Sequence, residues 1–263
     1  MSNANHDAAH VDLVAFWRRL DLSDGPYVHP DDRPFFARYR PHDLSHPPLD
    51  AASYAHDTVA QDPKFTHLSL LPVPYLGNLR RADIFILMLN PGFSQIEYQV
   101  ESNDDVITAL RRNLAQDVEK DDYPLWYLNP QFKHHPGHRY WASHLKGVGS
   151  HRELSNRIAV VERFPYHSKE FGHTAVVRKL PSSITAKRFV REIVLPRVIR
   201  QEALLIVARG ASAFGFSQHD KAPNLIVYGP GETAGAWLTD RSRGGVAIQA
   251  WIHAHPNLLG WAM

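Results

Sequence analysis

Three polar segments that each follow an apolar run carry the side chains best suited to chemistry in this chain. Asn90-Pro91-Gly92 follows the run 84–89, Glu162 ends the run 157–162, and His255-Pro256-Asn257 follows the run 246–251. In parallel sheets the carboxyl ends of strands meet at one edge, where loops from distant parts of the chain line a ligand pocket. If the runs are parallel strands, an amide, a carboxylate and an imidazole face one pocket. The alternative for Asn90 is an ordinary turn former.

The elements that would position these groups alternate along the chain. Apolar runs predict strands at 84–89, 157–162, 203–208, 224–228 and 246–251, and helical spacing predicts helices at 8–20, 104–117, 137–146 and 185–201, with Pro196 kinking or shortening the last. Strands separated by helices predict an α/β fold. We expect a three-layer α/β/α sandwich with a central, mostly parallel sheet of four to five strands.

Composition sets the broad class of the protein. With 263 residues, 44% apolar and 21% charged, the chain is long enough for a large core. Residues 1–70, rich in Pro, Asp and His, predict a helical and extended segment that wraps a domain spanning 71–263 as one compact unit. There is no cysteine, no secretory signal pattern and no run long enough to cross a bilayer. We expect a cytoplasmic monomer with no membrane partner.

A net charge of +2 neither indicates nor opposes nucleic-acid binding, because phosphates respond to a local basic face. The 17 histidines include pairs such as His134-His135, which a metal could use. Without carboxylates at regular spacing, solvated or hydrogen-bonding histidines are favoured. No metal and no cofactor are expected.

The order of the three segments resembles the uracil-DNA glycosylase superfamily. Asn90-Pro91-Gly92 is similar to the first motif of its mismatch-specific and single-strand-selective branches, and the strand before Pro165 is similar to the base-recognition strand. His255-Pro256-Asn257 is similar to the second motif, in which Ser is usual at the third position. The resemblance covers roughly 70–260 and leaves the first 70 residues unexplained.

The resemblance implies a role for each matched residue. Asn90 would position the water that attacks the sugar, by placement rather than by proton removal, and His255 would stabilise charge on the departing base. The base itself, extruded from the helix, would be held by Gly92, Phe93, Glu162, Tyr166 and Asn257. DNA would be contacted by Lys169, Arg209, Arg241 and Arg243.

Two departures from the family pattern concern the substrate. Gly92 stands where uracil-restricted members carry a bulky Tyr that excludes a 5-methyl group, so the pocket is expected to accept 5-substituted pyrimidines. Glu162 stands where relatives place an Asn, and an ionised carboxylate only accepts hydrogen bonds, which suits the N4 amino group of cytosine. The sequence therefore predicts a monofunctional DNA glycosylase for a 5-modified pyrimidine, with a modified cytosine favoured.

Other interpretations stay open at this point. The chain could be a nucleic-acid-binding protein that keeps the fold without the chemistry. His255 could close a C-terminal turn, Phe93 could be a core residue, and Glu162 could pair with Arg163, Lys169 or Arg209. An unrelated hydrolase or nucleotide-binding enzyme is disfavoured, because the chain has no Gly-x-Ser-x-Gly elbow and no Gly-Lys-Ser/Thr phosphate loop.

Overall fold

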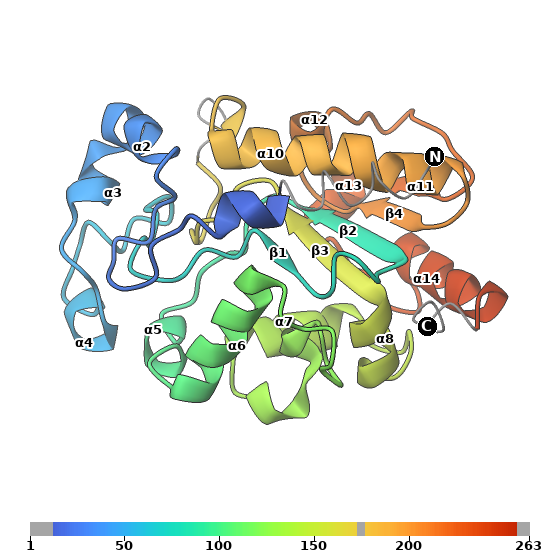
Figure 1. The fold of residues 1–263 in the computed structure, drawn as a ribbon, viewed down its shortest axis with the longest axis horizontal. Helices are drawn as coiled ribbons and strands as arrows, with labels where there is room; N and C mark the ends of the chain where they lie inside the picture. Colours follow the sequence, from blue (N-terminus) through green and yellow to red (C-terminus); the bar gives the residue numbers. More distant parts are fainter. Residues whose placement is uncertain (1–12, 173–176, 257–263) are drawn as a thin grey trace.

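A mixed five-stranded sheet runs through the computed structural model, which describes residues 13–172 and 177–256 (Figure 1). Its spatial order is β1-β3-β2-β4-β5. The strands are β1 (Tyr75–Leu76), β2 (Ile84–Met88), β3 (Ile158–Glu162), β4 (Leu204–Val207) and β5 (Leu225–Val227). The structure therefore belongs to the α/β class that the sequence predicts.

The strand pairings place a topological switch at the centre of the sheet. β2 pairs in parallel with β3 on one side and with β4 on the other, β4 pairs in parallel with β5, and the short β1 is antiparallel to β3. The chain therefore leaves β2 for β3 and then crosses back over β2 to reach β4. Loops that follow β2 and β4 diverge at such a point, which is where α/β sheets bind ligands.

Apolar side chains from β2 pack on both faces of the sheet. Ile84, Ile86 and Met88 belong to one buried cluster, whereas Phe85 and Leu87 belong to another.

Helices cover both faces of the sheet. Those that follow β1 in the described ranges are α5 (Glu97–Val100), α6 (Asp104–Ala115), η1 (Trp126–Leu128), η2 (Pro130–Phe132), α7 (Pro136–His144), α8 (His151–Arg157), α10 (Pro181–Phe189), η3 (Val190–Val194), α11 (Leu195–Ile199), α12 (Ala211–Phe214), α13 (Pro230–Thr233) and α14 (Arg243–Ala254). Helices α10 to α12 lie on one side of the sheet in Figure 1, and α6 to α8 lie on the other.

The helix predicted at 185–201 is interrupted where proline requires it. It forms as α10, a π-helical turn η3 and α11, and Pro196 stands in the first turn of α11. Proline cannot donate a backbone hydrogen bond and clashes with the preceding turn, so the helix widens before it. The prediction that Pro196 alters this helix is confirmed.

The strand predicted at 246–251 is wrong, because these residues lie within helix α14. Ser242 caps the helix by accepting a hydrogen bond from Gly245 N, and the buried residues Ile248 and Trp251 recur at helical spacing. Short apolar runs fit both a buried strand and a helix, and only packing decides between them. This difference moves the segment after residue 251 away from its expected position.

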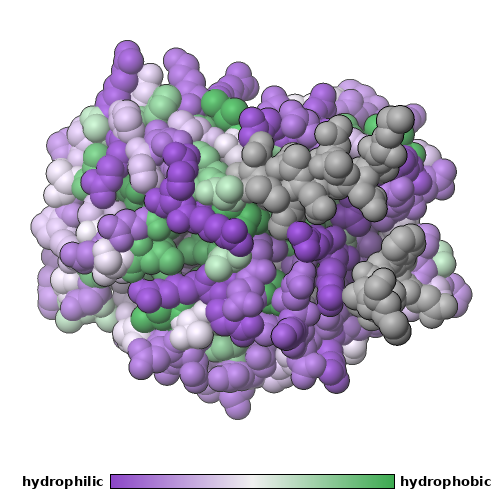
Figure 2. Space-filling model, viewed as in Figure 1, coloured by the Kyte–Doolittle hydropathy of each residue, from purple (hydrophilic) through white to green (hydrophobic). Residues whose placement is uncertain are grey.

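Residues 13–70 share the core of the sheet. Helices α2 (Arg33–Tyr39), α3 (Pro41–Ser45) and α4 (Ala51–Tyr54) lie at one end of the molecule in Figure 1. Leu13, Trp17 and Phe36 are buried in the same cluster as Phe85. In the same view, Figure 2 shows a mostly hydrophilic surface with hydrophobic residues gathered near the centre-left. Within the described ranges, no helix is both long and apolar enough to cross a membrane.

Candidate site at the carboxyl edge of the sheet

The ends of three adjacent strands bring Asn90, Glu162 and Arg209 to one edge of the sheet. Met88 is paired with Glu162 at the end of β2, and Asn90 follows Met88 by two residues. The ladder extends past the strands, because Phe164 N donates to Leu89 O and Arg209 N donates to Leu87 O. The sequence therefore predicts correctly that the segments after 84–89 and 157–162 end side by side.

The Asn90 side chain is held in one orientation. Its Nδ2 donates to Ser168 O at 3.0 Å and to Ser168 Oγ at 3.2 Å. Ser168 is buried, whereas Asn90 is partly exposed. With the amide NH2 group engaged, Oδ1 is left as a fixed acceptor, and it has no hydrogen-bond donor within the described part of the chain. A fixed acceptor of this kind can orient a water molecule.

The turn after Asn90 combines open space with an aromatic wall. Gly92 has φ +77°, a conformation that favours glycine, and a Cβ added there would meet no atom within 4 Å. Phe93 stacks on His67 with ring centroids 3.4 Å apart, and Tyr54 and Tyr98 contact its edge. Phe93 is only partly buried, so it lines the site but presents one face to a ring of this protein.

Glu162 is a buried carboxyl group without an ion pair among the described residues. Its Oε2 has no hydrogen-bond partner in that part of the chain. Burial raises its pKa to about 8, and the positive charges of Arg209 and His167 oppose this rise only in part. The neutral acid therefore predominates at pH 7. This corrects the sequence-based premise that Glu162 is ionised, and it also argues against pairing with Arg163, whose side chain reaches Ala213 O instead.

Further buried polar atoms around Glu162 are also left without partners. Tyr140 Oη and Arg209 Nε have none among the described residues, and both groups lie close enough to Glu162 to interact electrostatically. Glu101 Oε1 and His135 Nε2, 3.6 Å apart, are in the same state. Leaving a buried polar group unpaired costs about 1–3 kcal/mol, so native structures rarely keep such a cluster unless water or a ligand completes it.

His167 and Glu97, which sequence reasoning missed, hold the turn that carries Gly92. His167 Nδ1 donates to Gly92 O and Nε2 donates to Leu71 O, each at 3.1 Å. Two carbonyl partners require both ring nitrogens to carry protons. Burial alone lowers the His167 pKa, but the Glu97 carboxylate 3.5 Å away, together with Glu101, raises it to about 9. No local sequence pattern links these residues, which lie 70 positions apart.

His255 lies at the opposite edge of the sheet from Asn90, which contradicts their predicted partnership. Its ring packs on Trp251 with centroids 3.9 Å apart, and Trp251 Nε1 donates to Asp83, the residue before β2. Asn90 is seven residues beyond Asp83, roughly 23 Å along an extended strand. Because 246–251 is helical, His255 caps the end of α14, and its Nδ1 lies 3.0 Å from Trp251 O. It closes a C-terminal turn, as the alternative interpretation has it.

Tyr166 is likewise engaged elsewhere. It is buried, its hydroxyl donates to Asp32 at 2.7 Å, and that hydroxyl also accepts from His29 N. Its ring packs edge-on against Phe36 at 5.0 Å. Tyr166 therefore anchors the N-terminal segment rather than binding a base. Asn257 lies outside the described residues.

The four predicted DNA contacts differ in their availability. Lys169, beside Ser168, and Arg241 are exposed. Arg209 is partly buried at the site, and its Nη2 donates to Ala234 O. Arg243 is bound to Glu232 at 2.8 Å and donates to Val227 O, so its charge is already engaged.

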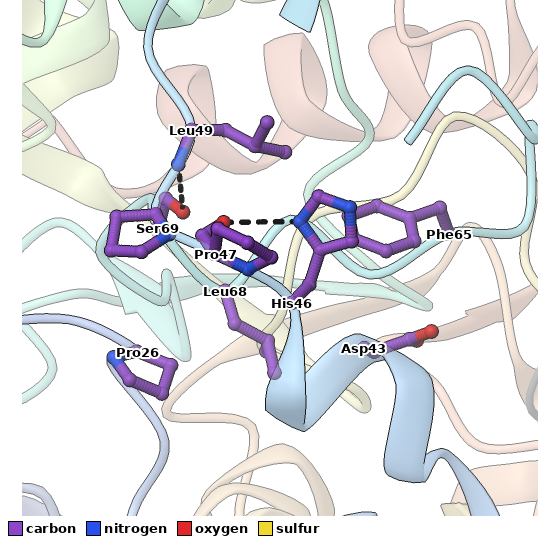
Figure 3. Close-up of a pocket in the computed structure, with 9 residues that line it drawn as sticks. Pro26, Asp43, His46, Pro47, Leu49, Phe65, Leu68 and Ser69 are labelled. Carbon is purple, nitrogen blue, oxygen red and sulfur yellow. Dashed lines mark hydrogen bonds between the residues drawn. The ribbon is translucent and has the colours of Figure 1, made fainter. Parts of the chain in front are cut away.

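Two cavities lie beside helices α3 and α6. Figure 3 shows one of about 10 Å³ beside α3, lined by residues such as His46, Phe65 and Ser69, which has room for one water molecule at most. A larger pocket of about 420 Å³ lies along α6, but several of its charged groups are paired with one another, including Arg112 with Asp121. None of the predicted site residues lines either cavity. Within 13–172 and 177–256, no group of three or more potential ligands is arranged to hold a metal ion.

Comparisons of the chain with protein-family models, with curated proteins and with solved structures find no significant match. The function is therefore inferred from the geometry of the carboxyl edge.

Proposed function

We propose that the chain is a monofunctional DNA glycosylase, in which an extruded 5-modified pyrimidine enters the carboxyl edge of a three-layer α/β/α sandwich. The observation that carries this proposal is the placement of Asn90 beside Glu162. A fixed amide acceptor lies two residues after β2, and a buried neutral acid ends β3, the parallel neighbour of β2, next to polar atoms without partners. The four strands β3, β2, β4 and β5 run parallel, and helices lie on both sides of the sheet, which supports the proposed layers.

Hydrolysis needs a nucleophile on one side of the sugar and a proton source at the base. Asn90 Oδ1 orients a water molecule whose oxygen forms a bond to C1′. The C1′–N bond breaks, its electron pair goes to the base, and the base takes the proton of Glu162. The water loses a proton to solvent, and solvent reprotonates Glu162. A carboxyl pKa of about 8 keeps this proton in place at neutral pH.

This assignment replaces His255 with Glu162 as the group that stabilises the departing base. His255 caps a helix at the other edge of the sheet and contacts Trp251. Glu162 and Arg209 both lie at the site, and Arg209 supplies a positive charge near the base. Transfer of a positioned proton contributes typically 10²- to 10⁴-fold to rate.

The open space at Gly92 favours a pyrimidine with a 5-substituent, because nothing described in the structure would meet even an added Cβ there. The neutral Glu162 offers one donor and one acceptor, which match N3 and the N4 amino group of cytosine. With the proton on its other oxygen, the same group also matches the edge of uracil. Gly92 supports the 5-substituent, whereas the neutral Glu162 fits both bases, so 5-substituted cytosines and 5-substituted uracils are tested side by side.

A nucleic-acid-binding protein without glycosylase activity is the second candidate. The position of His255 favours it, because the residue that the family resemblance assigns to leaving-group stabilisation is absent from this edge. Under this alternative the site still binds an unpaired base, and the protein acts as a monomer on DNA through Lys169 and Arg241.

A base-release screen separates the two candidates. Oligonucleotides carrying uracil, thymine mismatches or 5-substituted cytosines are incubated with the protein, and free base is measured. We expect release of a 5-substituted pyrimidine, a loss of about 100-fold or more in Asn90→Ala, and unchanged release in His255→Ala. DNA affinity should persist in Asn90→Ala. Binding without any base release would reject the glycosylase and favour the binding protein.

A further inference from the structure

Trp237, on the segment that follows α13, is one of the large apolar side chains that the structure leaves exposed. The residue is 50% exposed to solvent. Scattered exposed apolar residues need no explanation. Trp237 differs because its inner face is supported by a column of rings that leads back to the candidate site.

The column consists of three parallel rings. Trp237 stacks on His144 with centroids 4.4 Å apart and planes 15° apart, and His144 stacks on Tyr140 at 3.7 Å and 23°. Tyr140, the innermost ring, has the unpartnered hydroxyl close to Glu162 and Arg209. The outer face of Trp237 is thus the surface end of a stack that begins at the proposed base pocket.

Hydrogen bonds hold the column in place. The two ring nitrogens of His144 lie 2.8 Å from Tyr140 O and 3.0 Å from Gly235 O. Tyr228 Oη donates to Trp237 O at 2.5 Å, and Leu238 N donates to His144 O at 3.2 Å. The Trp237 backbone and the His144 ring beneath the indole are therefore held in place before any ligand arrives, which limits the entropy cost of binding.

Basic side chains accompany the exposed ring. Lys146, whose carbonyl accepts from Asp240 N, and Arg241 are exposed on the same connected segments. Arg209 donates to Ala234 O, three residues before Trp237. Asp240 offsets part of this charge, but the balance is positive. A flat ring beside positive charges is the arrangement that binds bases and phosphates of an unpaired strand.

We propose that Trp237 stacks on an unpaired base of single-stranded DNA that flanks the base held at Glu162. The inference rests on the proposed function, because it takes one base to be held at Glu162 while a neighbouring base of the same strand stacks on Trp237. Single-stranded DNA is required because both faces of a base inside a duplex are already stacked on neighbours, whereas an unpaired base can offer a face to the indole.

The test measures binding of oligothymidylate, of an oligomer of equal length without bases, and of a duplex. Full-length protein is compared with Trp237→Ala and with Trp237→Phe, which keeps a stacking ring. We expect Trp237→Ala to weaken oligothymidylate binding about 10-fold or more, Trp237→Phe to retain most of it, and the baseless oligomer to show no difference among the three proteins. Duplex binding should be weaker and insensitive to the substitution.

The outcomes distinguish this inference from the proposed function. If wild-type protein releases a base but Trp237→Ala binds oligothymidylate as wild type does, the stacking role is rejected and the glycosylase stands. If Trp237→Ala weakens binding while no base is ever released, the stacking role stands and the glycosylase is rejected. An equal loss on the baseless oligomer, or loss of the folded state in both variants by circular dichroism, would overturn the stacking role.

Discussion

At the amino edge of the sheet the Asp83 carboxylate accepts hydrogen bonds from Arg157 and from Trp251, whereas at the carboxyl edge Glu162 keeps an oxygen without a partner. Both carboxyl groups are buried, and each flanks a strand of the same sheet. Asp83 precedes β2 and joins α8 and α14 to it. Glu162 ends β3 amid other unpaired polar atoms.

The difference in hydrogen bonding indicates a structural role for Asp83 and a functional role for Glu162. A buried charge that is paired and hydrogen-bonded on every side holds elements together and has nothing left to offer a ligand. A buried acid that has an oxygen without a hydrogen-bond partner lowers stability, and such a group is typical of sites where a ligand or a reaction uses it. The two carboxyl groups should therefore respond differently to substitution and to pH.

The largest effect is expected at the amino edge. Asp83→Asn removes the charge that Arg157 is paired with and should lower the free energy of unfolding by about 3–5 kcal/mol. Urea denaturation measures this loss. The matched control is Asp31→Asn, which breaks the exposed pair with Arg19 and should cost at most about 1 kcal/mol. Similar losses in the two variants would show that Asp83 has no special structural role.

At the carboxyl edge the same kind of substitution should affect activity instead of stability. Glu162→Gln keeps the size and neutrality of the protonated acid but cannot transfer a proton. Base release in a single turnover should fall about 100-fold. At about pH 4, where the acid is largely neutral in both the folded and the unfolded state, the free energy of unfolding should change by less than about 1 kcal/mol. A stability loss as large as that of Asp83→Asn would remove the contrast between the edges.

The free energy of unfolding should depend on pH partly through the protonation of Glu162. Its pKa is about 8 in the folded protein against an ordinary value of 4.5, so the folded state binds more protons between these limits. Stability should therefore fall as pH rises from about 5 to 9, by a few kcal/mol at most for this group. His167 and Glu101 act in the same direction, so the comparison with Glu162→Gln isolates the effect. Urea denaturation at each pH should show a shallower fall for the variant, and parallel curves would contradict the assignment.

The smallest effect compares two tyrosines whose hydroxyl groups differ in their partners. Tyr75 Oη donates to Leu114 O at 2.6 Å, whereas Tyr140 Oη has no partner among the described residues. Tyr75→Phe should cost about 1 kcal/mol of unfolding free energy, and Tyr140→Phe should be neutral or slightly stabilising. If Tyr140→Phe is the more costly substitution, its hydroxyl is satisfied in solution and the carboxyl edge is less open than it looks.

Much of the fold could be predicted from local pattern. Continuous apolar runs identify β2, β3 and β4, because strands buried on both faces need apolar residues at every position. Proline marks the break in the helix at 181–199. The prediction of a strand at 246–251 was wrong, because the spacing of Val246, Ile248 and Trp251 fits either a strand or a helix. The hydrogen bond from Trp251 to Asp83 is a long-range contact that the local pattern does not contain.

The candidate site could be predicted only in part. Asn90 and Glu162 stand out because a polar residue directly follows or ends an apolar run. The protonation of Glu162, the clamp formed by Glu97 and His167, and the stack that begins at Trp237 all depend on side chains that are distant in the chain. Their pKa values and partners come from burial and proximity, neither of which is written in local order.

Local patterns in the sequence identify β2, β3 and β4 and show that Asn90 comes after the first of them and Glu162 at the end of the second, because hydrophobic periodicity and turn residues act locally. Contacts between distant segments set His255 at the far edge, join Tyr166 to the N-terminal segment, and leave Glu162 buried and unpaired. These contacts depend on how distant helices and strands pack against one another, and the packing free energy of the whole molecule determines that arrangement.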